Sequence, residues 1–232
     1  MKLKTFCGLL MATAALAAAP ASWAGVVVNG DFSAGLTGWS SLGDVTASGG
    51  SAQLSTASLY VDDAPAAAGT FNLSGTSAAL VGVPGGIEAF SGLSLGSLDP
   101  DPAAGTWAFE GSALRQTLAV AAGDTLRLDW HFSSQEDPLA GMNDYAFLVI
   151  DGLLIRLTDV SNAVGSGQFS YSFNTAGTVE LALGVVDVGD FIGTSTLGID
   201  NVVLDSALAV PEPGSLALAL LGLGMLRRRG RR

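Results

Sequence analysis

The chain has 232 residues, which suits one domain flanked by short terminal segments. Residues 25–209 hold 20 of the 21 acidic residues but only three arginines, a net charge of about −17. A surface this acidic repels phosphate and so excludes nucleic acid as a partner, while it is compatible with divalent cations and neutral glycans. The other interpretation is that the charge serves only to keep the domain soluble.

Residues 1–24 have the three parts of a secretory signal peptide. Two lysines lie within the first four positions, residues 6–19 are apolar, and small residues occupy the positions that specify cleavage after Ala24. The apolar run is short for a membrane span, which argues against the alternative of a retained anchor. The only cysteine, Cys7, lies in this segment, so the exported domain is expected to fold without disulfides.

The middle of the chain carries the two-residue alternation of β-strands. Apolar and polar side chains alternate over residues 126–132, 169–174 and 179–185. Glycine-containing turns separate such runs, and Asp151-Gly152 is typical of a two-residue hairpin. The further strands expected are 26–28, 45–48, 52–55, 78–83, 106–110, 114–120, 145–151, 153–158 and 198–204, with long loops between 64 and 101. This pattern predicts an all-β, antiparallel β-sandwich of the jelly-roll kind over residues 25–209.

Two short motifs lie near the ends of this domain. Residues 29–39 (Asn-Gly-Asp-Phe, then Gly-Leu-Thr-Gly-Trp) resemble the opening strand of carbohydrate-binding, galactose-binding-like jelly rolls, and residues 199–202 (Ile-Asp-Asn-Val) resemble their closing strand. In that family the first and last strands are neighbours. The resemblance implies a structural Ca²⁺ site to which Asp31 and Asp200 contribute, although Ser33 stands where the family often has an acidic residue. The alternative is that both aspartates make local turn hydrogen bonds.

Two acidic loops could meet at one end of the sandwich. The first holds Glu136, Asp137 and Asp144, and the second holds Asp187 and Asp190. If the loops meet, their carboxylates form a site for a cation or for sugar hydroxyls, because hard oxygen ligands are what Ca²⁺ requires. The alternative is that these residues are solvated loop ends.

The chain offers little for catalysis. His131 is the only histidine and lies on the polar face of its expected strand, and no nucleophile elbow, phosphate-binding loop or dinucleotide fingerprint is present. The many acidic residues make chance carboxylate pairs unavoidable, so such pairs do not indicate glycoside hydrolysis. Trp39, Trp107, Trp130 and Tyr145 are expected to be mostly core side chains rather than sugar-stacking platforms. We therefore expect a protein that is not an enzyme.

The C-terminal segment 210–232 has the layout of a membrane-targeting signal. A helix-breaking Pro-Glu-Pro is followed by an apolar run over 215–226, and five of the ten basic residues occupy the last six positions. As a helix, residues 216–226 span about 16 Å, roughly half of a hydrocarbon core of about 30 Å. An arginine cluster beyond such a run is the usual cytoplasmic stop. We expect a short, marginal transmembrane helix.

This tail resembles the PEP-CTERM sorting signal of Gram-negative bacteria that make extracellular polysaccharide, over roughly its last 25 residues. In that family an exosortase, a transpeptidase of the inner membrane, recognises and processes the tail. The resemblance implies that Pro211, Glu212 and Pro213 are the recognition motif and that Arg227, Arg228 and Arg229 are the cytoplasmic stop. Residues 122–151 and 184–190, which include the acidic loops, also look like a segment that recurs in such proteins. An ordinary tail anchor with a chance Pro-Glu-Pro is the alternative.

The expected organisation is therefore a signal peptide (1–24), a β-sandwich (25–209) and a sorting signal (210–232). It predicts an exported cell-surface or extracellular-matrix protein, held transiently in the inner membrane, with a structural or adhesive role in the exopolysaccharide. The alternative is a calcium-stabilised carbohydrate-binding module with a specific glycan ligand.

Overall fold

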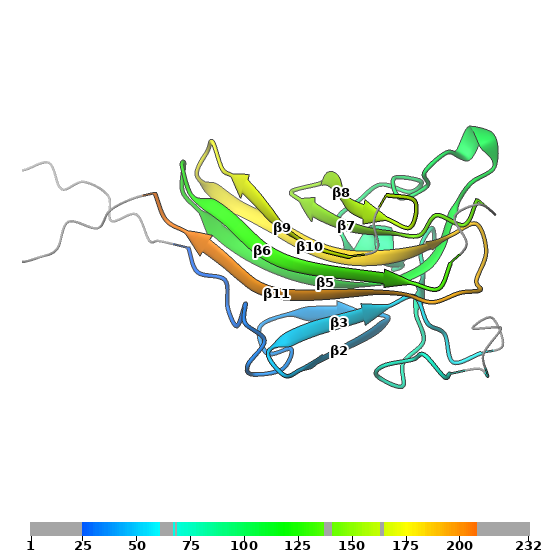
Figure 1. The fold of residues 1–232 in the computed structure, drawn as a ribbon. Coiled ribbons are helices and arrows are strands. Elements are labelled where there is room, and N and C mark those ends of the chain that lie inside the picture. Colours follow the sequence, from blue (N-terminus) through cyan, green and yellow to red (C-terminus); the bar gives the residue numbers. More distant parts are fainter. Residues whose placement is uncertain (1–24, 61–66, 68, 137–140, 163–164, 208–232) are drawn as a thin grey trace, which may run out of the picture.

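The computed structural model describes residues 25–60, 67, 69–136, 141–162 and 165–207, which form two antiparallel β-sheets (Figure 1). One sheet has the order β1-β5-β10-β7-β8, with β4 also paired to β5, and the other has the order β2-β3-β11-β6-β9. The strands are β1 Ser40–Leu42, β2 Asp44–Ser48, β3 Ser51–Ser55, β4 Ala79–Leu80, β5 Ala108–Val120, β6 Thr125–Ser134, β7 Tyr145–Ile150, β8 Leu153–Asp159, β9 Gly165–Ser172, β10 Gly177–Val188 and β11 Ser195–Asp205. The prediction of an all-β, two-sheet antiparallel architecture is confirmed.

Alternation along the strands builds the core between the sheets. On β6 the apolar side chains of Leu126, Leu128 and Phe132 are buried, while Arg127 and His131 between them are exposed. The inward residues of both sheets form one apolar cluster of Val, Leu, Ile, Phe and Trp side chains. Burial of this cluster is the main source of stability, at about 25 cal/mol for each Å² of apolar surface removed from water.

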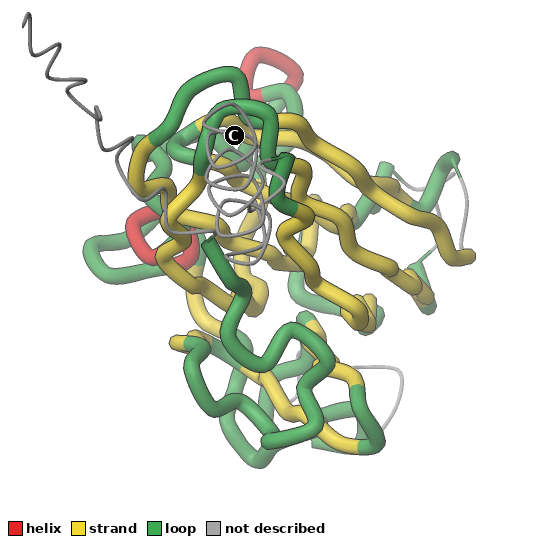
Figure 2. The backbone as a smooth tube through the Cα atoms, turned by 90° about the vertical axis from the view of Figure 1, so that its left-hand side faces the viewer, coloured by secondary structure: helices red, strands yellow, loops and turns green. Residues whose placement is uncertain are grey.

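The six-stranded sheet is covered on its other face as well. Strand β7 is buried along its whole length, so it reads as a continuous apolar run rather than an alternating one. A second apolar cluster, which includes Ile87, Leu98, Tyr145 and Phe147, lies on this face. It is supplied partly by the loops around the short helices α1 (Ile87–Phe90) and η2 (Pro102–Ala104), drawn red in Figure 2.

The buried carboxylate of Glu88 holds this covering loop in place. It accepts hydrogen bonds from the backbone N–H groups of Gly96 (3.0 Å) and Leu98 (2.8 Å). The hydroxyl of Tyr145 in turn donates to the carbonyl oxygen of Leu98. The long loops expected between 64 and 101 are therefore present where the chain is described, and fixed polar contacts give them a defined conformation.

Four strand predictions were wrong in detail. Residues 26–28 form no strand, because the side-chain amide of Gln116 contacts both backbone groups of Val28, accepting from its N–H (2.8 Å) and donating to its C=O (2.9 Å). Of the expected strand 78–83 only β4 remains. The expected strands 106–110 and 114–120 are instead one strand, β5, that runs through Gly111. A side chain at Gly111 would lie 2.2 Å from the carbonyl oxygen of Val185, so glycine permits the close pairing.

The predicted hairpin at Asp151-Gly152 joins β7 and β8. Both residues have positive φ, 49° and 80°, which is the conformation that a two-residue hairpin turn requires.

The two ends of the described chain lie side by side at one end of the sandwich (Figure 1). A side chain at Gly25 would lie 2.9 Å from Leu204, near the end of β11, and the backbone N–H of Ala207 donates to Asp124 (3.1 Å). The signal peptide 1–24, the motif Pro211-Glu212-Pro213 and the arginines 227–229 lie outside the described residues. Within the described ranges, no helix is long and apolar enough to cross a membrane.

Candidate functional site

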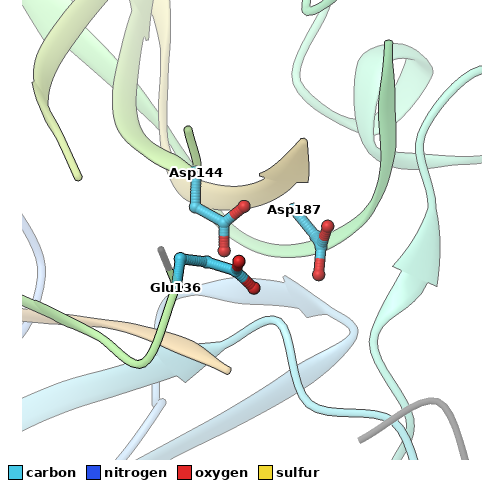
Figure 3. A group of neighbouring side chains, drawn as sticks. All are labelled: Glu136, Asp144 and Asp187. Atoms are coloured by element: carbon cyan, nitrogen blue, oxygen red, sulfur yellow. The ribbon is translucent and has the colours of Figure 1, made fainter. Parts of the chain in front are cut away.

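Three acidic side chains meet at the end of the sandwich opposite the chain termini. Glu136 follows β6, Asp144 precedes β7 and Asp187 is the penultimate residue of β10. Each offers a carboxylate oxygen, and these oxygens all lie within 4.8 Å of one another. Figure 3 shows the three carboxylates turned toward a common space from separate segments of the chain. We call these three residues the acidic cluster.

Asp144 is held rigidly by hydrogen bonds to both carboxylate oxygens. The backbone N–H of Val188 donates to Oδ1 (2.8 Å), and the hydroxyl of Ser195 donates to Oδ2 (2.6 Å). The backbone carbonyl of Asp144 also accepts from the N–H of Val160 (3.1 Å). These contacts join the starts of β7 and β11 to the end of β10, so the position of the carboxylate is fixed by the strands rather than by a loop.

Asp187 differs because one oxygen of its carboxylate, Oδ1, is buried without such a partner among the described residues. Its exposed fraction is 2%, and within the described part of the chain its Oδ1 has no hydrogen-bond partner. A buried carboxylate oxygen without a donor is energetically costly, by about 1–3 kcal/mol or more for a charged group. Such an atom in a native structure calls for a proton or a ligand that neutralises it.

Glu136 reaches the cluster from the end of β6. Its backbone N–H donates to the hydroxyl of Ser134 (2.9 Å), which lies 2.8 Å from the hydroxyl of Ser195. Its carboxylate lies against Gly193, where an added side chain would come within 2.1 Å of Oε1. Gly193 also has a φ of +87°, so this position requires glycine both for its backbone and for the space that the carboxylate fills.

Burial and mutual repulsion favour the protonated forms of the acidic cluster. Burial raises the pKa of Asp187 far above its usual range, and the nearby carboxylates, Asp144 foremost, raise it further. Burial also raises the pKa of Asp144 to about 7, against two hydrogen bonds that lower it. Neutralising charge must therefore accompany the ionised cluster.

The fixed cations of the domain are engaged elsewhere. Residues 25–209 contain no lysine and only three arginines. Arg127 pairs with Asp205 (3.2 Å), Arg156 pairs with Asp159 (3.6 Å), and Arg115 lies 3.7 Å from the carboxylate of Glu180. The donor set of the acidic cluster is made only of hard carboxylate oxygens, which suits Ca²⁺ or Mg²⁺ rather than a metal that prefers nitrogen or sulfur ligands.

The structure thus brings together three of the five residues expected in the acidic loops. Asp190 is half-buried at the rim, where its carboxylate accepts from the N–H of Ile192 (2.8 Å) and its charge acts on both Asp144 and Asp187. Asp137 lies outside the described residues. Sequence reasoning missed Ser195 and Gly193, because a serine or glycine gives no sign of the distant carboxylate that it contacts.

The motifs near the two ends of the domain lie against each other, as their resemblance implies. The N–H of Val202 donates to the carbonyl oxygen of Gly30 (2.9 Å). Asp31 is exposed and accepts from the N–H (3.3 Å) and hydroxyl (3.0 Å) of Ser33, and these bonds lower its pKa. Asp200 accepts from the N–H of Asn201 (2.6 Å). Both make the local hydrogen bonds of the alternative interpretation, and the calcium site at Asp31 and Asp200 stays a prediction.

A polar groove lies on the outer face of the five-stranded sheet. Asp129 of β6 is at its centre, and its carboxylate accepts from the side-chain amides of Gln168 on β9 (2.8 Å) and Asn201 on β11 (2.8 Å). Two adjoining depressions, of about 430 and 290 Å³, share Asp129 as a lining residue. The residues of this groove, as we define it, are Gln53, Arg127, Asp129, His131, Gln168 and Asn201.

A β-bulge completes the groove. The pairing of β11 with β6 shifts between Asp200 and Val203, and Asn201 there has a φ of +51°. The extra residue turns Asn201 onto the outer face beside Asp129. The alternation of β6 alone predicted that Arg127, Asp129 and His131 share a face, but the bulge had no signal in the sequence.

The aromatic residues lie mostly in the core, as expected. Trp39 and Tyr145 are buried, and Trp130 packs against the core and over Gly167. Among these four residues Trp107 is the exception, with 47% of its surface exposed. It lines neither depression of the groove, whereas Trp130 lines the smaller one.

No family model matches the chain, and no curated protein matches its sequence. Among similar solved structures is a chain described as "CBM4 structure and function", with a TM-score of 0.33 and 10% sequence identity. The match covers 77% of this chain and 98% of that chain. A likeness of this strength does not establish a shared function. The fold and its sites define an acidic, two-sheet antiparallel β-sandwich with a buried carboxylate cluster at one end and a polar groove on one face.

Proposed function

We propose that the protein is exported to the cell surface or extracellular matrix, where its sandwich associates with exopolysaccharide in a structural or adhesive role. The groove centred on Asp129 carries this proposal. Asp129 orients two side-chain amides, and each amide keeps its carbonyl oxygen and a second N–H for a ligand. Planar amide and carboxylate groups held by one another suit the paired hydroxyls of a sugar, and the acidic surface around them disfavours phosphate ligands.

The terminal segments supply the route in this proposal. The signal peptide directs the chain across the inner membrane, and the PEP-CTERM tail, with its short apolar run, holds it there until an exosortase acts on Pro211-Glu212-Pro213. The two described ends lie together at one end of the sandwich. A tail that begins there leaves the outer face of the five-stranded sheet and the opposite end of the sandwich free to face the matrix. No catalytic step is assigned to the protein.

A glycan array probed with the full chain tests the groove. Replacing Asp129 with alanine releases both amides, and we expect this variant to bind its best glycan about tenfold more weakly. The matched control is Glu180→Ala, which removes one negative charge from β10 in the other sheet and is expected to leave binding unchanged. Equal losses in both variants, or flat signals for the unaltered protein, would contradict binding through the groove, and flat signals would favour a purely structural role.

A further inference from the structure

The buried carboxylate of Asp187 is surrounded mainly by other carboxylates. The exposed fraction of Asp187 is only 2%, and its Oδ1 has no hydrogen-bond donor among the described residues. The three arginines of residues 25–209 pair with Glu180, Asp205 and Asp159, and the four charged groups that act most strongly on Asp187 are all carboxylates. Strands from both sheets nevertheless hold the cluster together, so the fold enforces a contact that electrostatics alone would oppose.

We propose that Glu136, Asp144 and Asp187 bind one Ca²⁺ ion at this end of the sandwich. Two oxygens that bind the same Ca²⁺ at about 2.3–2.6 Å lie at most about 5 Å apart, because they sit on opposite sides of the ion. The cluster meets this limit, since one carboxylate oxygen from each of the three residues lies within 4.8 Å of the other two. The Oδ1 of Asp187, buried and without a hydrogen-bond donor among the described residues, supplies one ligand atom.

The details of the cluster fit a ligand set. Asp144 keeps a lone pair on each oxygen after accepting from Val188 and Ser195, so its hydrogen bonds orient the carboxylate without saturating it. The missing side chain at Gly193 gives the Glu136 carboxylate room to approach. Three carboxylates, each able to bind through one or two oxygens, match the irregular coordination of Ca²⁺ better than the strict octahedron of Mg²⁺.

The ion would tie the end of β6 and the start of β7 to the end of β10, which lies about 40 residues further along the chain. It is separate from the predicted site at Asp31 and Asp200 and independent of the groove, which lies on the outer face of the five-stranded sheet. An exported domain without disulfides gains from such a cross-link, because a ligand that binds only the native state stabilises it.

Thermal unfolding of the full chain tests the proposal, with Ca²⁺ or Mg²⁺ added after treatment with EDTA. For the unaltered protein we expect Ca²⁺ at 100-fold above its dissociation constant to raise the Tm by about 5–10 °C. Asp187→Asn is expected to abolish this rise, and Glu136→Gln, at the half-buried edge of the cluster, is expected to weaken Ca²⁺ binding at least about tenfold. Isothermal titration with CaCl₂ should show one binding site for each chain that is present in the unaltered protein and lost in Asp187→Asn.

Asp200→Asn is the matched control, because it makes the same chemical change at the other predicted calcium site. We expect this variant to keep the full rise in Tm. The assignment to the acidic cluster would be overturned if Ca²⁺ still raised the Tm of Asp187→Asn. It would also be overturned if Ca²⁺ no longer raised the Tm of Asp200→Asn. Stabilisation by Mg²⁺ but not Ca²⁺, or by neither ion, would overturn it as well. If Asp187→Asn does not fold, the Ca²⁺ affinity and the Ca²⁺-induced rise in Tm of Glu136→Gln test the assignment in its place.

Discussion

Replacing Asp44 with asparagine is expected to lower the free energy of unfolding by about 3 kcal/mol and the Tm by about 6–12 °C. The Asp44 carboxylate is fully buried, and four groups donate hydrogen bonds to it. It accepts from the N–H groups of Leu73 (2.9 Å) and Ser74 (2.8 Å), from the Ser74 hydroxyl (2.7 Å) and from the hydroxyl of Ser55. An asparagine amide would direct its own N–H₂ group at some of these donors and leave them unsatisfied.

Chemical denaturation of the two proteins measures this difference. Asp205→Asn is the control, since its carboxylate is half exposed and makes a surface ion pair with Arg127, worth about 0–1 kcal/mol. The Asp44 variant should keep its response to Ca²⁺ while losing stability. A loss below about 1 kcal/mol would show that the carboxylate is not the anchor of the 72–76 loop.

The calcium-free protein is expected to lose stability as the pH rises from about 4 to 7. The folded-state pKa values of Asp144 and Asp187 are raised above the ordinary value of 3.8, so in this window the folded chain binds protons that the unfolded chain has released. The stabilising effect is therefore complete below pH 3.8 and is lost as the pH rises toward the folded pKa, about 7 for Asp144 and higher for Asp187. Each group contributes a slope of at most about 1.4 kcal/mol per pH unit.

Comparison with Asp187→Asn isolates this effect from the other carboxylates. An amide is close in shape to a protonated carboxyl but does not titrate, so in EDTA the variant should become more stable relative to the unaltered protein at each step from pH 4 to 7. Saturating Ca²⁺ at pH 7 should make the unaltered protein the more stable of the two, because only this protein keeps the Asp187 carboxylate that binds the ion. A stability difference in EDTA that does not change with pH would show that Asp187 is ionised in the folded, calcium-free state.

The strand pattern was predictable because burial is a local property of each alternating run. The segments 126–132, 145–151 and 153–158 correspond closely to β6, β7 and β8. The errors arose where a distant side chain replaced backbone pairing, as Gln116 does at Val28, or where glycine continued a strand, as in β5.

The meeting of the acidic loops was predictable, but the chemical difference between their members was not. In the sequence Asp44 and Asp187 look alike, since each precedes a valine. One is saturated by donors about 30 residues away, and the other has a buried oxygen without a donor among the described residues. Such long-range partners depend on the assembled sheets, so only the three-dimensional structure distinguishes an anchoring carboxylate from a proposed metal ligand.

Export underlies both the polysaccharide contact and the use of extracellular calcium, and a reporter fusion tests it most directly. Alkaline phosphatase, which requires export to form its disulfides, would be fused after residue 207 of the chain with its own first 24 residues. We expect an active reporter, and an inactive one when residues 2–24 are removed. An inactive phosphatase in the intact fusion, with the folded domain recovered from the cytosol, would contradict the proposed placement of the protein outside the inner membrane.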